Sequence, residues 1–137
     1  MHWDFSDHNV LVIGGSSGIN LGIAQGFAEA GAKLGVVSRS QEKVDTAVRT
    51  LSTQTEAIGF SADVRDYEAI ATCSHDFCKH FGPIEVLVSG AAGNFPAPLT
   101  GMSANGFKAV MDIDLLGTFH VMRSTHAFLA KPGSTVI

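Results

Sequence analysis

The residues best suited to chemistry are a group of small residues near the start of the chain. A backbone without bulky side chains can approach a phosphate, and the first turn of a following helix adds free N–H groups and a partial positive charge. The group lies between an apolar segment, 9–13, and a helical pattern, 18–30. In that setting such a turn typically binds the diphosphate of a dinucleotide, although a tight strand-to-helix turn without a ligand is the alternative. The candidate residues are Gly14, Ser16, Ser17, Gly18 and Ile19.

Position 20 departs from this pattern. Many such loops carry a third glycine there, because the helix packs closely on the strand at that point. This chain has Asn20 instead. We expect its side chain to push the helix slightly outward and Gly22 to relieve the crowding.

Two polar residues at the end of the next apolar segment bear on which dinucleotide would bind. An acidic residue about twenty positions beyond the glycine-rich turn would bind a ribose 2′-hydroxyl and favour NAD. This chain has Ser38 and Arg39 there. A guanidinium can form two charge-assisted hydrogen bonds with a 2′-phosphate and a serine hydroxyl can donate another, so these residues favour NADP over NAD. The alternative is that Arg39 is a solvated surface residue.

Two further groups follow later apolar segments. Asp63 can accept from an adenine amino group while Val64 packs on the ring, and the alternative for Asp63 is a helix cap. Small residues further on would let the backbone approach a ribose, and Phe95 beyond them could face a nicotinamide or an apolar substrate. A flexible loop is the alternative for this segment. The small residues are Gly90, Ala91, Ala92 and Gly93.

An acidic residue interrupts an apolar stripe in the last helical pattern. Carboxylates on such stripes need partners or acquire raised pKa values, and such groups gather at active sites. Asp114 is therefore the candidate catalytic residue, and the alternative is a structural aspartate that binds backbone or a missing segment. Asp112 points elsewhere and is expected to be solvated. At helical spacing the stripe contains Phe107, Val110, Met111, Asp114, Thr118 and Val121.

Metal and disulfide chemistry are not indicated by the sequence. Cys73 and Cys78 lie five residues apart in a helical pattern, which places them on different faces and favours two reduced thiols. The six histidines are scattered without ligand spacing. We therefore predict no metal site.

Composition and charge exclude some classes of partner. The chain has 137 residues, 45% of them hydrophobic and 16% charged, with a formal net charge of −4. A negative charge argues against nucleic acid and anionic membranes as main partners. No apolar run approaches the roughly 20 residues that span a bilayer. The N-terminus does not resemble a signal peptide and the C-terminus does not match the peroxisomal Ser-Lys-Leu signal, so we expect a cytoplasmic protein.

Strand-like and helix-like patterns alternate along the chain. Strands separated by helices imply right-handed crossovers and a parallel sheet with helices on both faces. We therefore predict one α/β domain over 1–137, a doubly wound parallel sheet of the Rossmann type. It would be truncated after a fifth strand, because an apolar strand at a chain end is an unpaired edge. The predicted strands are 9–13, 34–38, 57–61, 84–88 and 134–137, and the predicted helices are 18–30, 41–51, 67–81 and one long helix from Ser103 to about 130.

These motifs together resemble those of the short-chain dehydrogenase/reductase family. Residues 13–20 resemble its Thr-Gly-x-x-x-Gly-x-Gly cofactor motif, with Ile13 for threonine and Asn20 for the last glycine. Residues 63–64 match its adenine-contacting pair, and the segment beginning Ser89-Gly90 stands where the family usually has Asn-Asn-Ala-Gly. The segments 91–95, 111–114 and 117–119 are more similar to the peroxisomal type of 2,4-dienoyl-CoA reductase and its bacterial relatives.

The resemblance implies hydride transfer between NADP(H) and a small-molecule carbonyl or enoyl substrate, such as an acyl-CoA thioester, in a homodimer or homotetramer. It implies an acid/base role for Asp114 where most members have asparagine. The family's catalytic serine and Tyr-x-x-x-Lys lie beyond the fifth strand, and the only tyrosine here, Tyr67, is followed four residues later by Ala71. We therefore expect this chain alone to be inactive. A catalytically silent dinucleotide-binding module is the alternative function.

Overall fold

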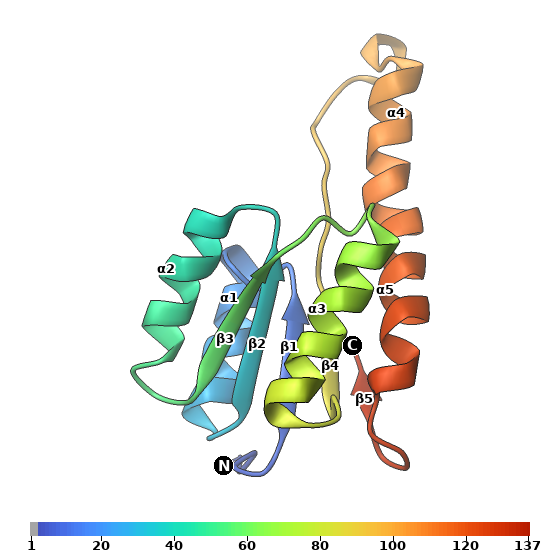
Figure 1. The fold of residues 1–137 in the computed structure, drawn as a ribbon. Helices are drawn as coiled ribbons and strands as arrows, with labels where there is room; N and C mark the ends of the chain where they lie inside the picture. The colour runs from blue at the N-terminus through green and yellow to red at the C-terminus, as the bar shows by residue number, and fades with distance from the viewer. Residues whose placement is uncertain (1–2) are drawn as a thin grey trace.

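The protein is a five-stranded parallel sheet with helices on both faces (Figure 1). The computed structural model describes residues 3–137. The strands lie in the order β3-β2-β1-β4-β5, so the order reverses at β1. This is the doubly wound, Rossmann-type fold predicted from the sequence. The elements are β1 Asn9–Ile13, α1 Gly18–Glu29, β2 Lys33–Ser38, α2 Gln41–Leu51, β3 Ala57–Ser61, α3 Tyr67–Phe81, β4 Val86–Ser89, α4 Ala104–Met111, a π-helical turn Asp112–Leu116, α5 Gly117–Thr125 and β5 Thr135–Val136.

The central strand β1 is buried on both of its faces. Val10 and Val12 point to one side and pack in a core with α1 and α2, whereas Leu11 and Ile13 point to the other and pack with α3 and α5. This follows from the two-residue repeat of a strand, since successive side chains point to opposite faces. The helices α1, α2, α3 and α5 therefore each cover an apolar face of the sheet, which becomes the middle of three layers.

The helices α2, α3 and α4 each begin after a short polar residue that caps the first turn. Ser40 Oγ accepts from the Lys43 N–H at the start of α2, Asp66 accepts from the Ala69 N–H at the start of α3, and Ser103 accepts from Gly106 at the start of α4. Short polar side chains satisfy N–H groups that the helix itself leaves without partners. The predictions for β1, α2, β3 and α3 are confirmed residue for residue, whereas β4 begins two residues later than expected.

The inward face of α1 is predicted only in part. Helical spacing places Ile19, Ile23, Gly26 and Phe27 on one face, and of these Ile23 and Phe27 do pack against the core. The fully buried residues of α1 are instead Ala24 and Ala28, while Ile19 is 83% exposed and Gly26 is also exposed. Alanines allow the helix axis to approach the sheet closely, and this close packing decides which face turns inward.

The expected single long helix is also wrong. It divides into α4, the π-helical turn and α5, followed by a short 3-10 turn at His126–Phe128, and the chain is extended again at Leu129. The apolar stripe divides with it: Val121 is buried, whereas Phe107 is 59% exposed and Met111 is 36% exposed. Figure 1 shows the reason, because α4 projects beyond the edge of the sheet and has no layer to cover.

A pair of glycine substitutions tests the packing between the layers. A methyl group at Gly35 on β2 would lie 2.5 Å from the ring of the fully buried Phe77. We expect Gly35→Ala to lower the free energy of unfolding by about 1–3 kcal/mol, as measured by urea denaturation. The matched control is Gly22→Ala on α1, where a methyl group meets open space and should raise that free energy by about 0.5–1 kcal/mol. Equal effects at the two positions would contradict this packing.

Candidate functional site

A crevice of about 750 Å³ lies at the carboxyl ends of the first four strands. Its walls come from the connections that follow β1, β2, β3 and β4, and it sits where the strand order reverses. Ligands of open parallel sheets bind at this kind of position. Gly18 and Gly93 do not line it. The predicted site residues that line it are Gly14, Ser16, Ser17, Ile19, Ser38, Arg39, Asp63, Val64, Gly90, Ala91 and Ala92.

The turn after β1 brings bare backbone into the crevice. Gly14 has a positive φ of 83°, and a methyl group there would lie 2.9 Å from the Ala91 nitrogen. Gly18 also has a positive φ, of 58°. Gly14 therefore requires glycine for steric and conformational reasons, whereas at Gly18 a methyl group would meet nothing and only the backbone conformation favours glycine.

The start of α1 differs from the starts of α2, α3 and α4. Ser17 precedes it, but its side chain accepts no hydrogen bond from the first turn, and within residues 3–137 this first turn contains no acidic residue. The caps of α2, α3 and α4 are each a side-chain oxygen, as described above. The N–H groups and the partial positive charge at the start of α1 are therefore directed into the crevice without a protein acceptor, as suits an anion.

The end of β2 forms a cationic wall. Arg39 is exposed and lines the crevice together with Lys43 on the first turn of α2. Ser38 accepts a hydrogen bond from Ser16 Oγ at 2.7 Å, which ties this wall to the glycine-rich turn. Lys43 is a lining residue that was not predicted from the sequence. Its position three residues after the Ser40 cap was the available signal, since that spacing places it on the first turn.

Asp63 is held by a neighbouring arginine. Arg65 Nε donates to Asp63 Oδ1 at 3.0 Å and Arg65 Nη2 donates to Oδ2 at 2.6 Å, a two-pronged pair. The hydrogen bond from the Arg65 side chain lowers the pKa of Asp63 below its ordinary value, and Arg39 adds a smaller effect in the same direction. The helix-cap alternative for Asp63 is wrong, because Asp66 caps α3. Val64 beside it is buried against Gly117.

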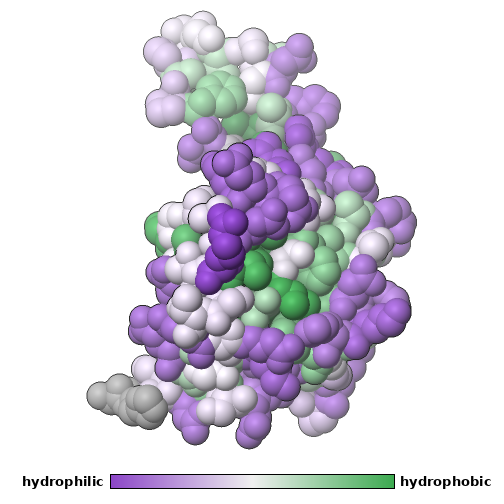
Figure 2. Space-filling view, turned by 60° about the vertical axis from the view of Figure 1, so that its left-hand side comes forward, coloured by the Kyte–Doolittle hydropathy of each residue, from purple (hydrophilic) through white to green (hydrophobic). Residues whose placement is uncertain are grey.

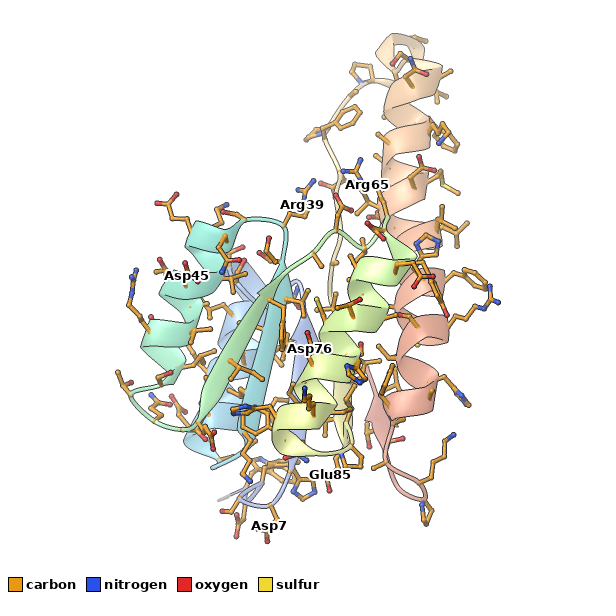
Figure 3. The ribbon with its side chains drawn as sticks, viewed as in Figure 1. Asp7, Arg39, Asp45, Arg65, Asp76 and Glu85 are labelled. Atoms are coloured by element: carbon orange, nitrogen blue, oxygen red, sulfur yellow. The ribbon has the colours of Figure 1, made fainter. Side chains whose placement is uncertain are left out.

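Cationic side chains gather at this edge of the sheet. Figure 3 shows Arg39 and Arg65 there, whereas Asp7 and Glu85 lie at the opposite end of the strands. Figure 2 shows strongly hydrophilic groups beside an apolar hollow on this side of the molecule. An anionic ligand would therefore meet the cations at the carboxyl ends of the strands.

Asp114 holds the loop that follows β4. Its Oδ1 accepts from the backbone N–H of Gly93 at 2.8 Å, and the side chain is half-buried. The contact agrees with the backbone-binding alternative for Asp114. Asp114 lies in the π-helical turn. Such a turn inserts one extra residue into an α-helix, which changes the direction of the side chains, and it is often found at functional sites. Asp112 pairs instead with Lys108.

The expectation for Phe95 is wrong, because Phe95 does not line the crevice: it is 46% exposed and lies against Gly106 on α4. The Asn20 side chain makes a specific contact, since its Nδ2 donates to the Gly90 carbonyl at 2.7 Å. Gly22 relieves no crowding, since it is exposed and a methyl group there would meet nothing.

The cysteines are free, as expected, and burial raises both of their pKa values, that of Cys73 to about 11. Such thiols are poor nucleophiles at neutral pH. Within residues 3–137 no cluster of three or more His, Cys, Asp or Glu side chains could hold a metal ion. In the same residues no helix is long and apolar enough to span a membrane.

The sequence profile of the short chain dehydrogenase family matches residues 8–137. The chain belongs to that family. It is 38% identical over 122 residues to a peroxisomal 2,4-dienoyl-CoA reductase from Arabidopsis thaliana, a match that covers 88% of this chain and 41% of the relative. It is 42% identical over 134 residues to the reductase of that name from Pongo abelii, covering 96% of this chain and 46% of the relative.

Solved structures show the same fold. The L-sorbose reductase of Gluconobacter frateurii, solved with NADPH and L-sorbose, superposes with a TM-score of 0.89 at 22% identity. That match covers 99% of this chain and 53% of the reductase. The chain therefore spans less than half the length of the two curated relatives above and about half of this structure.

Replacing Arg65 tests the electrostatics of the adjacent carboxylate. A lowered pKa in the folded protein means that the Asp63–Arg65 pair stabilises the fold above the ordinary aspartate pKa, about 4. That stability is lost as the pH falls through the lower folded value. In Arg65→Met the pKa of Asp63 should rise toward its ordinary value, as followed by carboxyl NMR during an acid titration. Arg123→Met is the control, because Arg123 lies over the Tyr67 ring. An unchanged Asp63 pKa in Arg65→Met would contradict the assignment.

Proposed function

We propose that this chain is the cofactor-binding part of an NADP-dependent oxidoreductase that passes a hydride between NADP(H) and a carbonyl or an enoyl-CoA substrate. The observation that carries the proposal is the crevice itself. It combines an α1 N-terminus without a side-chain cap or acid with a cationic wall at the end of β2. One end suits a diphosphate and the other suits a further phosphate, which matches an extended nucleotide with two separate anionic groups.

The described residues fit such a cofactor. The backbone at Gly14 and the start of α1 would hold the diphosphate. Residue 14 must be small there, since a side chain would clash with Ala91 in the loop after β4. Val64 would flank the adenine, with Asp63 beside it. The segment 90–92 would face the ribose on the nicotinamide side of the diphosphate, because its small residues leave the backbone accessible. The bound cofactor would supply the hydride, and the protein supplies binding and orientation.

The choice of NADP over NAD rests on charge. Arg39 and Lys43 line the same wall of the crevice, and Ser38 lies next to them. The nearby acid, Asp63, is already paired with Arg65. A 2′-phosphate would therefore meet two cations. A ribose hydroxyl without a phosphate would find no carboxylate at the end of β2 to accept a hydrogen bond from it.

The substrate proposal rests on the relatives and on Asp114. Both curated relatives described above are named as 2,4-dienoyl-CoA reductases, so we propose a conjugated enoyl thioester as the substrate class. Reduction of a conjugated enoyl group needs a proton as well as a hydride. Asp114 carries a carboxylate near the crevice, positioned by the Gly93 N–H, and we propose that it assists this proton transfer.

A catalytically silent dinucleotide-binding module is the alternative function. The only tyrosine in the sequence, Tyr67, lies on α3, its ring 5.9 Å from that of His120, and it does not line the crevice. A tyrosine acid like that of the resembled family is therefore not part of the described site. Continuing the reading frame decides between the two functions, because a downstream Tyr-x-x-x-Lys would favour the enzyme.

Self-association and cellular location remain proposals. Apolar side chains on the π-helical turn and α5 are exposed, and we propose that a second copy covers them in a homodimer or homotetramer. The cytoplasmic location stays a prediction, since the two reductases compared above are peroxisomal in name. The exposed residues are Leu115 at 63%, Leu116 at 41%, Phe119 at 54% and Met122 at 39%.

A charge reversal at the end of β2 tests the cofactor. Arg39→Asp should reverse the preference between NADPH and NADH, because a carboxylate repels a 2′-phosphate and accepts from a ribose hydroxyl. We expect NADPH affinity to fall by about tenfold or more, in line with the loss of a charged hydrogen bond, as measured by calorimetric titration. Arg49→Asp makes the same charge change in the last turn of α2 and should leave the order unchanged. If Arg39→Asp also keeps the order, Arg39 plays no part in selecting the cofactor.

Two substitutions of Asp114 separate proton transfer from positioning. Asn keeps an oxygen that can accept from Gly93 N–H but cannot exchange a proton, whereas Ala loses both functions. In protein expressed from the whole reading frame we expect Asp114→Asn to slow the NADPH-dependent reduction of a 2,4-dienoyl-CoA by about 100-fold or more. NADPH binding should be retained in Asn and weakened in Ala. Full activity in Asp114→Asn would leave the aspartate with a positioning role alone.

A further inference from the structure

One side chain joins two walls of the crevice that are 70 positions apart in the sequence. Asn20, in the first turn of α1, donates from Nδ2 to the Gly90 carbonyl at 2.7 Å. A carbonyl oxygen only accepts, so the amide nitrogen is the atom that faces it. Asn20 is half-buried and also lines the crevice. The contact therefore lies within the candidate site.

The position of this carboxamide depends on residue 90 being glycine. A methyl group built on Gly90 would overlap the Oδ1, Cγ and Nδ2 atoms of Asn20. The space can hold a side chain from residue 20 or from residue 90, but not from both. These are also two positions at which the chain departs from the motifs it resembles, with asparagine in place of glycine at 20 and Ser89-Gly90 in place of Asn-Asn.

The segment that follows Gly90 has few other anchors. The Gly90 N–H donates to the Ile13 carbonyl at 2.9 Å, which extends the pairing of β1 and β4. The next anchor along the chain is the bond from Gly93 N–H to Asp114 at 2.8 Å. Asn20 is thus the contact that ties the β4 end of this segment to the first turn of α1.

We propose that Asn20 is a positioning residue that fixes the segment 90–93 against the start of α1. The two walls then form one preformed surface for the diphosphate and the adjoining ribose. Preformed walls bind more tightly because less conformational entropy is lost when the ligand arrives. The inference rests on the proposed cofactor function and adds the residue that sets the spacing between the two parts of the site.

Four variants and two ligands test this proposal. The variants are Asn20→Gly, Asn20→Leu, Gly90→Asn and the double variant Asn20→Gly/Gly90→Asn. NADPH spans the whole crevice, whereas adenosine 2′,5′-bisphosphate has the adenine half alone and does not reach the segment 90–93. Calorimetric titration of each variant with each ligand gives the dissociation constants.

The expected pattern is selective. Asn20→Gly should weaken NADPH binding by about fivefold to tenfold, the effect of one lost hydrogen bond, and leave the bisphosphate unchanged. Asn20→Leu keeps the branching at Cγ and does not lower the helix propensity, but it has no donor, so it should show the same selective loss. Gly90→Asn alone should lose more NADPH affinity, because two side chains then compete for one space. The double variant should regain NADPH affinity, since one amide again occupies that space.

A control variant and three contrary results complete the test. Gln25→Gly weakens α1 by a similar loss of helix propensity without touching Gly90, and should bind both ligands as the unaltered protein does. If the unaltered protein does not bind NADPH, the proposed function itself fails. If it does bind, equal losses for the two ligands in Asn20→Gly and Asn20→Leu overturn the positioning role. Additive losses in the double variant overturn the pairing of Asn20 with Gly90.

Discussion

Burial of β1 on both of its faces is the constraint on which this fold depends. Val10, Leu11, Val12 and Ile13 are at most 1% exposed, and they alternate between two separate apolar layers. A strand of this kind needs helices on both sides, and the crossovers that supply them keep the strands parallel. All carboxyl ends therefore meet at one edge. The crevice is a consequence of this arrangement, because four strand-to-helix connections converge where the order reverses.

At that edge, many polar groups organise the walls of the crevice. Arg65 holds Asp63, Asp114 holds Gly93, Asn20 holds Gly90, and Ser16 joins Ser38. Three of these contacts join different segments of the chain, and the Arg65–Asp63 pair lies within the turn after β3. The start of α1 and the cationic wall with Arg39 and Lys43 remain directed into the open space. The result is a surface with two positive regions, which is the basis of the proposal of a dinucleotide with a further phosphate.

The part of the molecule that projects beyond the sheet is not packed against it. α4 and the loop before it stand away from the three layers, and Phe107 and Leu99 lie exposed there. Figure 2 shows apolar surface on this projecting lobe. The π-helical turn separates the projecting helix from α5, whose Val121 packs in the core. Asp114 lies at this transition and connects the helix to the crevice loop through Gly93.

The sequence by itself determined the strands, the first three helices and the place of the crevice, but not the division of the last helical segment. Caps such as Ser40 and Asp66 act on N–H groups three residues away, and strand alternation and the glycine-rich turn are equally local, so each can be inferred from neighbouring residues. Only the tertiary structure decided which side chains meet. Ile19 faces outward because Ala24 and Ala28 allow closer packing, and Phe95 leaves the crevice because α4 projects away from it. The hydrogen bond from Asn20 to Gly90 forms because the fold brings two segments 70 positions apart in the sequence into contact. No pattern among neighbouring residues indicates that contact.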